Sequence, residues 1–406
     1  MAELLGFCSI ALVSLIILIF ALRWPAIANI LFVALAVRVA LMLIGYYGFT
    51  LPDSTFDAMG FEQGAWDRSQ EGFYKIITYG VNSNYIKSII AIPYALFGRS
   101  ILMAQSISLF FGMGTVFLGW LLTKKIWDEN TAIKVGWVLA LFPTLILYSV
   151  LTLREVYSCF FILVAMIGIV DWIRTDSYKS ISLAMLGFIG GIFFHGGIII
   201  GGIIFLILIF LRSSKKVFNL LLNYRANPKH LFIILLSLIF LVFYFSNKIH
   251  IPKLGTFEDS INLSRLTNEL GFRLKGDASY PEWTKIETPA EFIYKGFTRI
   301  LYLLFSPFPW DVKKPNHLIG MLDGFLYITL VYLILRNRKA IWKDPALKTI
   351  FLILFCYLFI FGIGVSNFGA GTRHRSKFVV ELIILAAPLI PTITFFKKKK
   401  IRNYIS

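Results

Sequence analysis

Residues 4–22 read LLGFCSIALVSLIILIFAL and residues 27–50 read IANILFVALAVRVALMLIGYYGFT, two long apolar runs joined by a short segment that contains Arg23. At 1.5 Å per residue, a helix of about 20 residues crosses a hydrocarbon core about 30 Å thick. Each run therefore predicts a membrane-spanning helix, and the two together predict a helical hairpin within the bilayer.

Runs of this kind recur along the whole chain. Apolar residues make up 58% of the sequence and charged residues 15%, with a mean hydropathy of +0.76, so charge is too sparse to cover a water-soluble protein of this size. We expect an all-α polytopic membrane protein with about 11 transmembrane helices in a single transmembrane domain over residues 1–406. The expected spans lie near 4–22, 27–50, 101–123, 130–150, 156–173, 181–196, 197–211, 230–247, 317–335, 348–366 and 377–395.

The basic residues indicate which way the chain crosses the membrane. The net charge of +18 comes from clusters in short connections between apolar runs, and these clusters do not form the long amphipathic face that nucleic acid would need. The clusters occupy alternate connections, as the positive-inside rule requires of cytoplasmic loops. We therefore expect a multi-pass membrane protein with two larger extracytoplasmic loops at 51–100 and 248–316 that contain interfacial or re-entrant segments.

The first of these outer loops is rich in acids. Asp53, Asp57, Glu62 and Asp67 lie within 15 residues. If the segment from residue 56 is helical, Asp57 stands at the head of an apolar face that lies on the membrane. A carboxylate in that position can remove a proton from an acceptor, so Asp57, Asp53 and Glu62 are the catalytic candidates. The alternative is a solvated loop in which Asp53 caps a helix.

Polar residues also interrupt the outer ends of later spans. Arg154 and Glu155 lie at the turn into the span at 156–173, and His195 stands before two glycines at another turn. An interfacial ion pair can anchor a hairpin, and a histidine can bond carbonyls that glycines leave free. The functional alternative is that Arg154 faces a phosphate while Glu155 orients it, and that His195 is a ligand or an acid–base group.

The last outer loop holds the densest group of cations. Residues 366–377 read SNFGAGTRHRSK, and they lie on the side where the positive-inside rule disfavours basic residues. Guanidinium groups bind phosphate through paired N–H groups, so we interpret Arg373, His374 and Arg375 as binding a lipid phosphate. Contacts with acids of the first outer loop, or with ordinary headgroups, are the alternative. Arg38, inside a span, needs a partner or a cavity.

Two tryptophans are candidates for sugar or interface contact. Trp310 closes the segment Pro307-Phe308-Pro309-Trp310, and Trp66 lies between Glu62 and Asp67 in the acidic part of the first loop. Aromatic rings of this kind stack on sugars or, more commonly, anchor at the headgroup level. No spacing typical of a metal site and no glycine-rich phosphate loop is present, so we assign no metal ligand and no cofactor, and a need for a divalent cation stays open.

Six short motifs follow one another along the chain: Asp57-Ala-Met-Gly-Phe61-Glu62, Ala104-Gln105, Phe142-Pro143, Leu153-Arg154-Glu155, Pro307-Phe308-Pro309-Trp310 and Gly371-Thr372-Arg373-His374-Arg375. Taken in this order, they resemble motifs of the bacterial polytopic glycosyltransferases of the GT-C superfamily, especially the family 39-like proteins of surface-polysaccharide loci. The resemblance implies a GT-C-like fold, a location in the bacterial inner membrane, a polyprenyl-linked sugar donor used outside the cytoplasm, and Asp57 as the base, with Asp53 second.

The expected activity is therefore transfer of a sugar from polyprenyl phosphate or diphosphate, in cell-surface polysaccharide or glycoconjugate synthesis. The expected partners are the polyprenyl-linked sugar, the lipid bilayer and proteins of polysaccharide assembly, and not nucleic acid. A Wzy-type O-antigen or capsule polymerase or ligase is the nearest alternative, because such enzymes recognise the lipid diphosphate with outer-loop arginines. A lipid-linked oligosaccharide flippase is less favoured, since it predicts charges along a midplane cavity and paired halves with broken helices.

Overall fold

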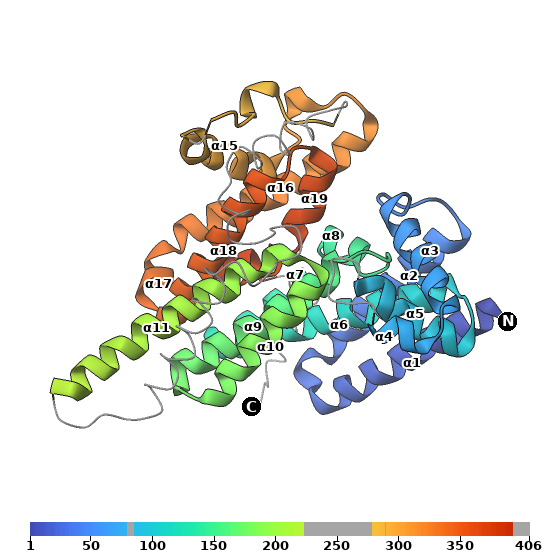
Figure 1. Cartoon of the computed structure of the whole chain (residues 1–406), viewed down its shortest axis with the longest axis horizontal. Helices are drawn as coiled ribbons and strands as arrows, with labels where there is room; N and C mark the ends of the chain where they lie inside the picture. The colour runs from blue at the N-terminus through green and yellow to red at the C-terminus, as the bar shows by residue number, and fades with distance from the viewer. Residues whose placement is uncertain (79–84, 223–277, 289, 393–406) are drawn as a thin grey trace, which may run out of the picture.

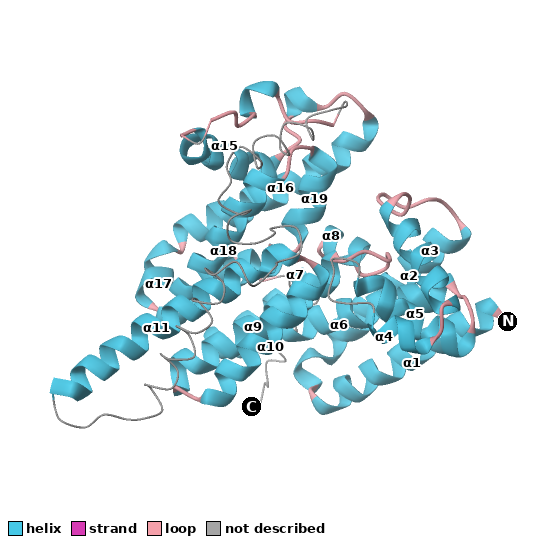
Figure 2. Ribbon diagram, viewed as in Figure 1, coloured by secondary structure: helices cyan, strands magenta, loops and turns pink. Residues whose placement is uncertain are grey.

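The computed structural model describes residues 1–78, 85–222, 278–288 and 290–392, and helices account for almost all regular structure in these ranges. Figure 2 shows helices joined by short loops. Among the described residues, extended pairing is limited to one isolated bridge between Ser279 and Asn367. The prediction of an all-helical chain is confirmed for this part of the protein.

Seven described helices are long and apolar enough to cross a membrane. The chain is therefore a polytopic helical membrane protein, although the expected total of eleven spans is not reached within the described ranges. The seven are α1 (Ala2–Arg23), α2 (Ala28–Tyr47, after the 3₁₀ turn Pro25–Ile27), α6 (Ile101–Ile126), α9 (Glu155–Thr175), α11 (Ile199–Leu222, after the 3₁₀ turn Gly196–Ile198), α16 (Pro315–Arg336) and α18 (Pro345–Gly364).

Four expected spans differ from this set. The segment 130–150 is two helices, α7 (Glu129–Leu141) and α8 (Pro143–Tyr148), because Phe142 is extended and Pro143 has no N–H to continue the helix. The segments at 181–196 and 377–395 form shorter apolar helices, α10 (Tyr178–Phe194) and α20 (Val379–Ala386), the latter followed by the 3₁₀ turn Ala387–Leu389. The span expected at 230–247 lies outside the described residues.

The stretch between α2 and α6 contains three short helices, α3 (Asp57–Gln70), α4 (Phe73–Thr78) and α5 (Tyr85–Phe97). Helix α3 packs along α5, and Arg68 of α3 donates to Ser88 of α5 over 2.8 Å. The turn before α3 has positive φ at two non-glycine residues, Asp53 (59°) and Phe56 (44°). This sharp turn points α3 away from the axis of α2, and Figure 1 shows α3 above the α1–α6 layer.

The rest of the described chain comprises five short elements around α16 and α18. They are the 3₁₀ turn Glu282–Thr284, α15 (Glu291–Phe305), the 3₁₀ turn Pro309–Asp311, α17 (Arg338–Lys343) and α19 (Phe368–Ser376). Helices α15 and α19 pack on each other and lie near α16 and α18, as Figure 1 shows.

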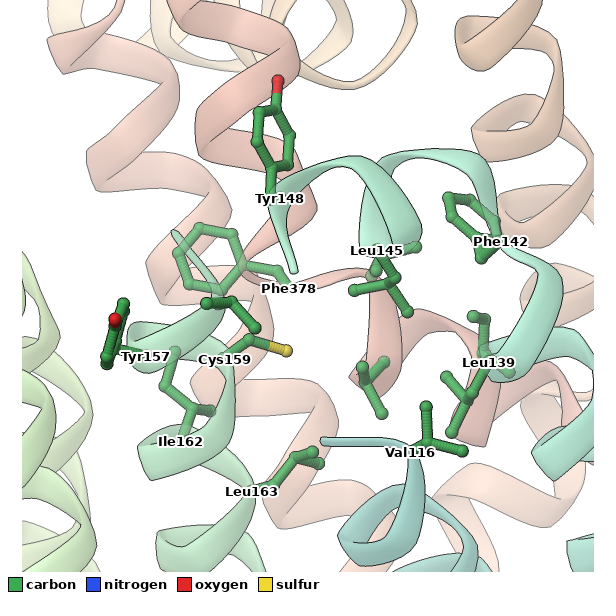
Figure 3. Close-up of a cluster of buried hydrophobic side chains, with 14 of the residues drawn as sticks. Val116, Leu139, Phe142, Leu145, Tyr148, Tyr157, Cys159, Ile162, Leu163 and Phe378 are labelled. Atoms are coloured by element: carbon green, nitrogen blue, oxygen red, sulfur yellow. The ribbon is translucent and has the colours of Figure 1, made fainter. Parts of the chain in front are cut away.

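Small residues allow the closest helix pair to form. A Cβ atom on Gly168 of α9 would lie 2.4 Å from the backbone nitrogen of Ala184, and one on Gly187 of α10 would lie 2.3 Å from that of Ala165. Backbone contact of this kind replaces the hydrophobic driving force that lipid does not provide. Figure 3 shows the apolar cluster beside α9, where Cys159 and Leu163 face side chains from α6, α7 and α8.

The ends of α9 mark the two sides of the bundle. Its 21 residues span about 31 Å, which matches the hydrocarbon thickness. At its C-terminal end, Arg174 lies 3.8 Å from Asp344 and Lys125 lies 2.8 Å from Asp171. The basic connections that the sequence assigns to the cytoplasm therefore meet at one end of the bundle, and Glu155 marks the other end.

Three fully buried arginines bind the C-terminal ends of helices. Arg38 donates to the carbonyls of Leu139 (3.2 Å) and Ala140 (2.8 Å) at the end of α7. Arg299 donates to Gly362 (3.1 Å) and Val365 at the end of α18, and Arg375 donates to carbonyls at the end of α15. The last carbonyls of a helix have no intrahelical partner and carry partial negative charge, so they can receive a cation. Each guanidinium thus compensates a helix end inside the protein.

Candidate functional site

A group of polar side chains gathers at the Glu155 end of the bundle. Four separate parts of the chain contribute to it: the turn before α3 with the first residue of α3, the α8–α9 connection, the turn after α10, and α19 with the residue that follows it. We call this group the polar cluster. It consists of Asp53, Asp57, Tyr148, Arg154, Glu155, His195, Arg373, His374 and Lys377.

Arg373 is the centre of the polar cluster. Its Nη1 lies 2.6 Å from Oδ2 of Asp57, and its Nη2 lies 3.3 Å from Oε1 of Glu155. Burial acts to lower the pKa of Arg373, but the carboxylates of Glu155 and Asp57 outweigh burial and raise it. One guanidinium therefore connects the first predicted outer loop, the start of α9 and the last predicted outer loop.

Glu155 is the buried acid of the polar cluster. Its side chain is 3% exposed, and its Oε1 also lies 3.6 Å from Nζ of Lys377, which is itself buried. The carboxylate stands in the first turn of α9, where the helix dipole favours negative charge. Oε2 of Glu155 and Nε of Arg373 have no hydrogen-bond partner among the described residues. Buried polar atoms of this kind usually bind a ligand or an ordered water.

Two histidines lie next to this ion pair. Nδ1 of His374 lies 2.7 Å from Nζ of Lys377, and the ring of His374 meets that of His195 edge to face, with centroids 5.2 Å apart. Both imidazoles also pack on Phe361. Nδ1 of His195 accepts a hydrogen bond from the backbone of Gly197, so His195 caps the turn and also belongs to the polar cluster.

Asp53 is a further acid of the polar cluster, and its partner is Tyr148. Its Oδ2 accepts a hydrogen bond of 2.8 Å from the hydroxyl of Tyr148, and burial raises the pKa of Asp53 above the ordinary value of 3.8. Figure 3 shows the Tyr148 hydroxyl pointing away from the apolar cluster. Sequence reasoning missed Tyr148, because a tyrosine in an apolar helix carries no signal of its own.

Arg154 and the neighbouring connection hold α3 in place. The Arg154 guanidinium lies 4.9 Å from the ring centroid of Phe61, and burial lowers its pKa. The hydroxyl of Thr152 donates to the carbonyl of Ala58 over 2.7 Å. The connection between α8 and α9 thus contacts the N-terminal half of α3 through a polar and an aromatic contact.

Lys377 belongs to the cationic segment of the last predicted outer loop, but the sequence did not single it out as a site residue. It lies four residues after Arg373 and faces the same acid.

The structure does not place Arg375 with its neighbour Arg373. Arg375 is fully buried and faces the other way, with Nη2 2.6 Å from Oδ2 of Asp323. Its remaining donors reach the carbonyls of Leu304, Ser306 and Gly320. In this structure the donor groups of Arg375 are all directed at protein oxygens, and none of these oxygens belongs to the polar cluster.

Glu62 and the two tryptophans also lie outside the polar cluster. Glu62 is buried and accepts two hydrogen bonds from Arg99, at 2.9 and 2.6 Å, and one from Tyr94 at 2.7 Å. The Glu62 carboxylate is thus held by Arg99 and Tyr94 and contacts no residue of the polar cluster. Trp66 contacts Tyr94 and Arg99, whereas Trp310 is 73% exposed and stacks on Phe308.

Two further observations concern metal ligands and the position of the polar cluster relative to an apolar groove. No group of three histidine, cysteine or acidic side chains suited to a metal ion occurs among the described residues. An apolar groove of about 490 Å³ lies between α1, α5 and α6, lined by residues such as Leu5, Pro93 and Phe110. None of these three helices supplies a residue of the polar cluster, so groove and cluster are separate features.

Comparison with known proteins adds no relative: no family model matches the chain, and neither a curated protein nor a solved structure matches it. The chemistry of the polar cluster therefore rests on its own geometry. It combines permanent cations and carboxylates at one end of a membrane-spanning bundle, an arrangement suited to binding an anionic group and moving a proton beside it.

Proposed function

We propose that the chain is a membrane glycosyltransferase that transfers a sugar from a polyprenyl-phosphate or polyprenyl-diphosphate donor on the extracytoplasmic face, in cell-surface polysaccharide or glycoconjugate synthesis. The observation that carries the proposal is the position of Arg373 between Asp57 and Glu155, at the end of α9 opposite the basic connections. A lipid phosphate reaches that level of the membrane, and a guanidinium is the side chain that binds it best.

The exposures of the two acids suggest how a donor binds. The Asp57 side chain is 57% exposed and that of Glu155 is 3% exposed. An ion pair that involves an exposed carboxylate contributes little free energy, so a phosphate can displace Asp57 from Arg373. Glu155 stays in place and keeps the guanidinium oriented. Donor binding thus releases a carboxylate beside the phosphate that Arg373 has taken.

The released Asp57 carboxylate then acts as general base. The acceptor hydroxyl oxygen forms a bond with the anomeric carbon, and its proton passes to Asp57. The bond from the anomeric carbon to the phosphate oxygen breaks, and the electron pair leaves on the phosphate. Arg373 and Arg154 stabilise the negative charge that develops there, as preorganised cations do in a partly buried site.

The test is transfer from a radiolabelled undecaprenyl-linked sugar by the purified protein in detergent. We expect Asp57→Asn and Arg373→Ala to lose transfer, and Asp67→Asn to keep it, because Asp67 is an exposed acid of the same helix outside the polar cluster. The absence of transfer by the wild-type protein with every donor tried would count against a transferase.

One observation favours a second candidate. Asp57 is already the ion-pair partner of Arg373, so it can be a structural acid rather than a base. This arrangement suits a Wzy-type polymerase or ligase, in which arginines bind the lipid diphosphate without a clear catalytic acid. Loss of transfer in Arg373→Ala together with full transfer in Asp57→Asn would support this second candidate.

A further inference from the structure

Arg38 is a buried charged residue of a membrane-spanning helix, and the proposed reaction does not use it. Its side chain is fully buried within α2, and its contacts are carbonyl and hydroxyl oxygens: Ala34 at 3.2 Å on its own helix, Leu139 and Ala140 on α7, and the Ser149 hydroxyl at 3.3 Å. No ion pair with an acid is formed among the described residues. Moving a charged group from water into a bilayer is unfavourable, so the contacts of Arg38 have to offset a large desolvation free energy.

The contacts of Arg38 lie on both sides of the break between α7 and α8. Leu139 and Ala140 belong to the last turn of α7, whose free carbonyls form the negative end of the helix dipole. Ser149 follows directly on α8, which ends at Tyr148. The planar guanidinium presents several donors in a fixed fork, so a single side chain fixes the direction in which α8 leaves α7.

Helix α6 also packs closely against Ser149, through Gly112. A Cβ atom on Gly112 would lie 2.2 Å from the Ser149 hydroxyl oxygen and 2.4 Å from its Cβ. Only a glycine at position 112 leaves room for Ser149 where Arg38 reaches it. The residue beside it, Tyr148, donates to Asp53 over 2.8 Å, and Thr152 bonds to Ala58 of α3.

We infer that Arg38 is a positioning residue for the polar cluster: by holding the α7–α8 break, it places the Tyr148 hydroxyl on Asp53 and the Arg154–Glu155 segment beside Arg373. The guanidinium acts through α8, and it touches neither donor nor acceptor. The catalytic consequence rests on the proposed function, whereas the placement of α8 does not.

The first experiment therefore measures structure and not activity. Hydrogen exchange of the purified protein in detergent is compared for the wild type, Arg38→Met and the control Arg174→Met. The Arg174 side chain is 40% exposed and lies at the other end of the bundle. We expect amides of residues 142–154 to exchange about tenfold faster or more in Arg38→Met, since each lost bond to a charged donor corresponds to at least that factor in a local opening equilibrium. Residues 345–364 should be unchanged. Equal exchange of 142–154 in Arg38→Met and wild type would overturn the inference.

A milder pair of variants covers the case in which Arg38→Met does not fold. Gly112→Ala keeps Arg38 but pushes against Ser149, and we expect it to raise exchange in the same segment. Ser149→Ala removes one contact of Arg38, that of Nε, together with the hydrogen bond that the Ser149 hydroxyl donates to the carbonyl of Leu145, and we expect a smaller increase. Unchanged exchange in both variants would also overturn the inference.

The second experiment tests the catalytic consequence by a double-mutant cycle. Arg38→Lys retains the charge without the fork, and we expect it to lower kcat by about 100-fold with little change in KM, because a displacement of about 1 Å at a reacting group has an effect of that size. If Arg38 acts through Tyr148, the double variant Arg38→Lys/Tyr148→Phe is no slower than the slower single variant. Additive losses would show a general structural role. If no variant and no wild-type sample transfers sugar, the proposed function fails while the exchange result still decides the placement.

Discussion

Arg373 and Arg375 are two residues apart, and their guanidinium groups have different partners, which one pair of variants can separate. Arg375→Met removes the partner of Asp323, which is 5% exposed and pairs with Arg375 at 2.6 Å. Removal of one member of a buried ion pair leaves an uncompensated charge and costs about 3–5 kcal/mol. For a protein of this size, about 2 °C per kcal/mol gives a fall of roughly 6–10 °C in the unfolding midpoint.

The assay is thermal unfolding in detergent at one fixed scan rate, with size-exclusion chromatography of the heated samples as the readout. The double variant Asp323→Leu/Arg375→Met is the critical comparison, because it removes both charges and leaves an apolar pair. We expect it to recover most of the lost midpoint. Arg373→Met serves as the matched control and should shift the midpoint less, since Asp57 stays hydrated and Lys377 still faces Glu155.

Two outcomes would refute this reasoning. An Arg375→Met midpoint within about 1 °C of the wild type would show that the buried pair contributes no net stability. A double variant as unstable as the single one would show that the orphaned Asp323 charge is not the cause of the loss. In the second case, the carbonyl contacts of Leu304, Ser306 and Gly320 would carry the effect.

Three further predictions concern other parts of the chain. Burial raises the pKa of Asp53, so the ionised carboxylate lowers the stability of the folded protein. We therefore expect Asp53→Asn to raise the unfolding midpoint at pH 7. This increase in the midpoint should vanish below about pH 3.9, where the acid is protonated in both the folded and the unfolded protein. Glu62→Gln leaves the Arg99 guanidinium without its carboxylate, and we expect a lower midpoint but sugar transfer near the wild-type rate per folded molecule, which radiolabel transfer would check. Gly187→Leu should prevent the close approach of α9 and α10, and loss of the monodisperse peak in size-exclusion chromatography would show it.

The membrane architecture was predictable from sequence because hydropathy reports directly on the bilayer as solvent. The described spans begin and end near the predicted limits, as α1 and α6 show. The prediction of one span over 130–150 was wrong, because this apolar segment contains a helix break. Pro143 is the residue in the sequence that indicates the break. A hydropathy average over a window of residues hardly changes at a single proline. The backbone does change there, because proline has no N–H group and removes one hydrogen bond of the helix.

The polar cluster was partly predictable for a related reason. Asp57, Glu155, His195 and Arg373 each stand out as polar residues at the end of an apolar run, and the alternative that Arg373 contacts acids of the first loop is what the structure shows. Arg375 looks identical in sequence, because the direction of a side chain depends on the helix face, and the Asp323 that it meets is 52 residues away.

The residues of the polar cluster that could not be predicted from the sequence are Tyr148 and Lys377, because no local sequence pattern distinguishes them. Tyr148 joins the polar cluster only because α8 turns after Phe142, and its hydroxyl meets an acid 95 residues earlier in the chain. Lys377 is one of several basic residues in its loop, and its selection depends on Glu155 being within reach. Distances of this kind follow from tertiary packing, which a single sequence does not determine.

The contacts of Arg38 also set an order of events during synthesis. Its carbonyl partners on α7 are 101 and 102 residues later in the chain. At about 5–20 residues per second, α2 is complete roughly 5–20 s before those carbonyls exist. During that interval the guanidinium has no carbonyl of α7 to bind, and a charged side chain in that situation is accommodated by headgroups or water. One charged side chain thus makes the final contacts of the second helix depend on the completion of the seventh.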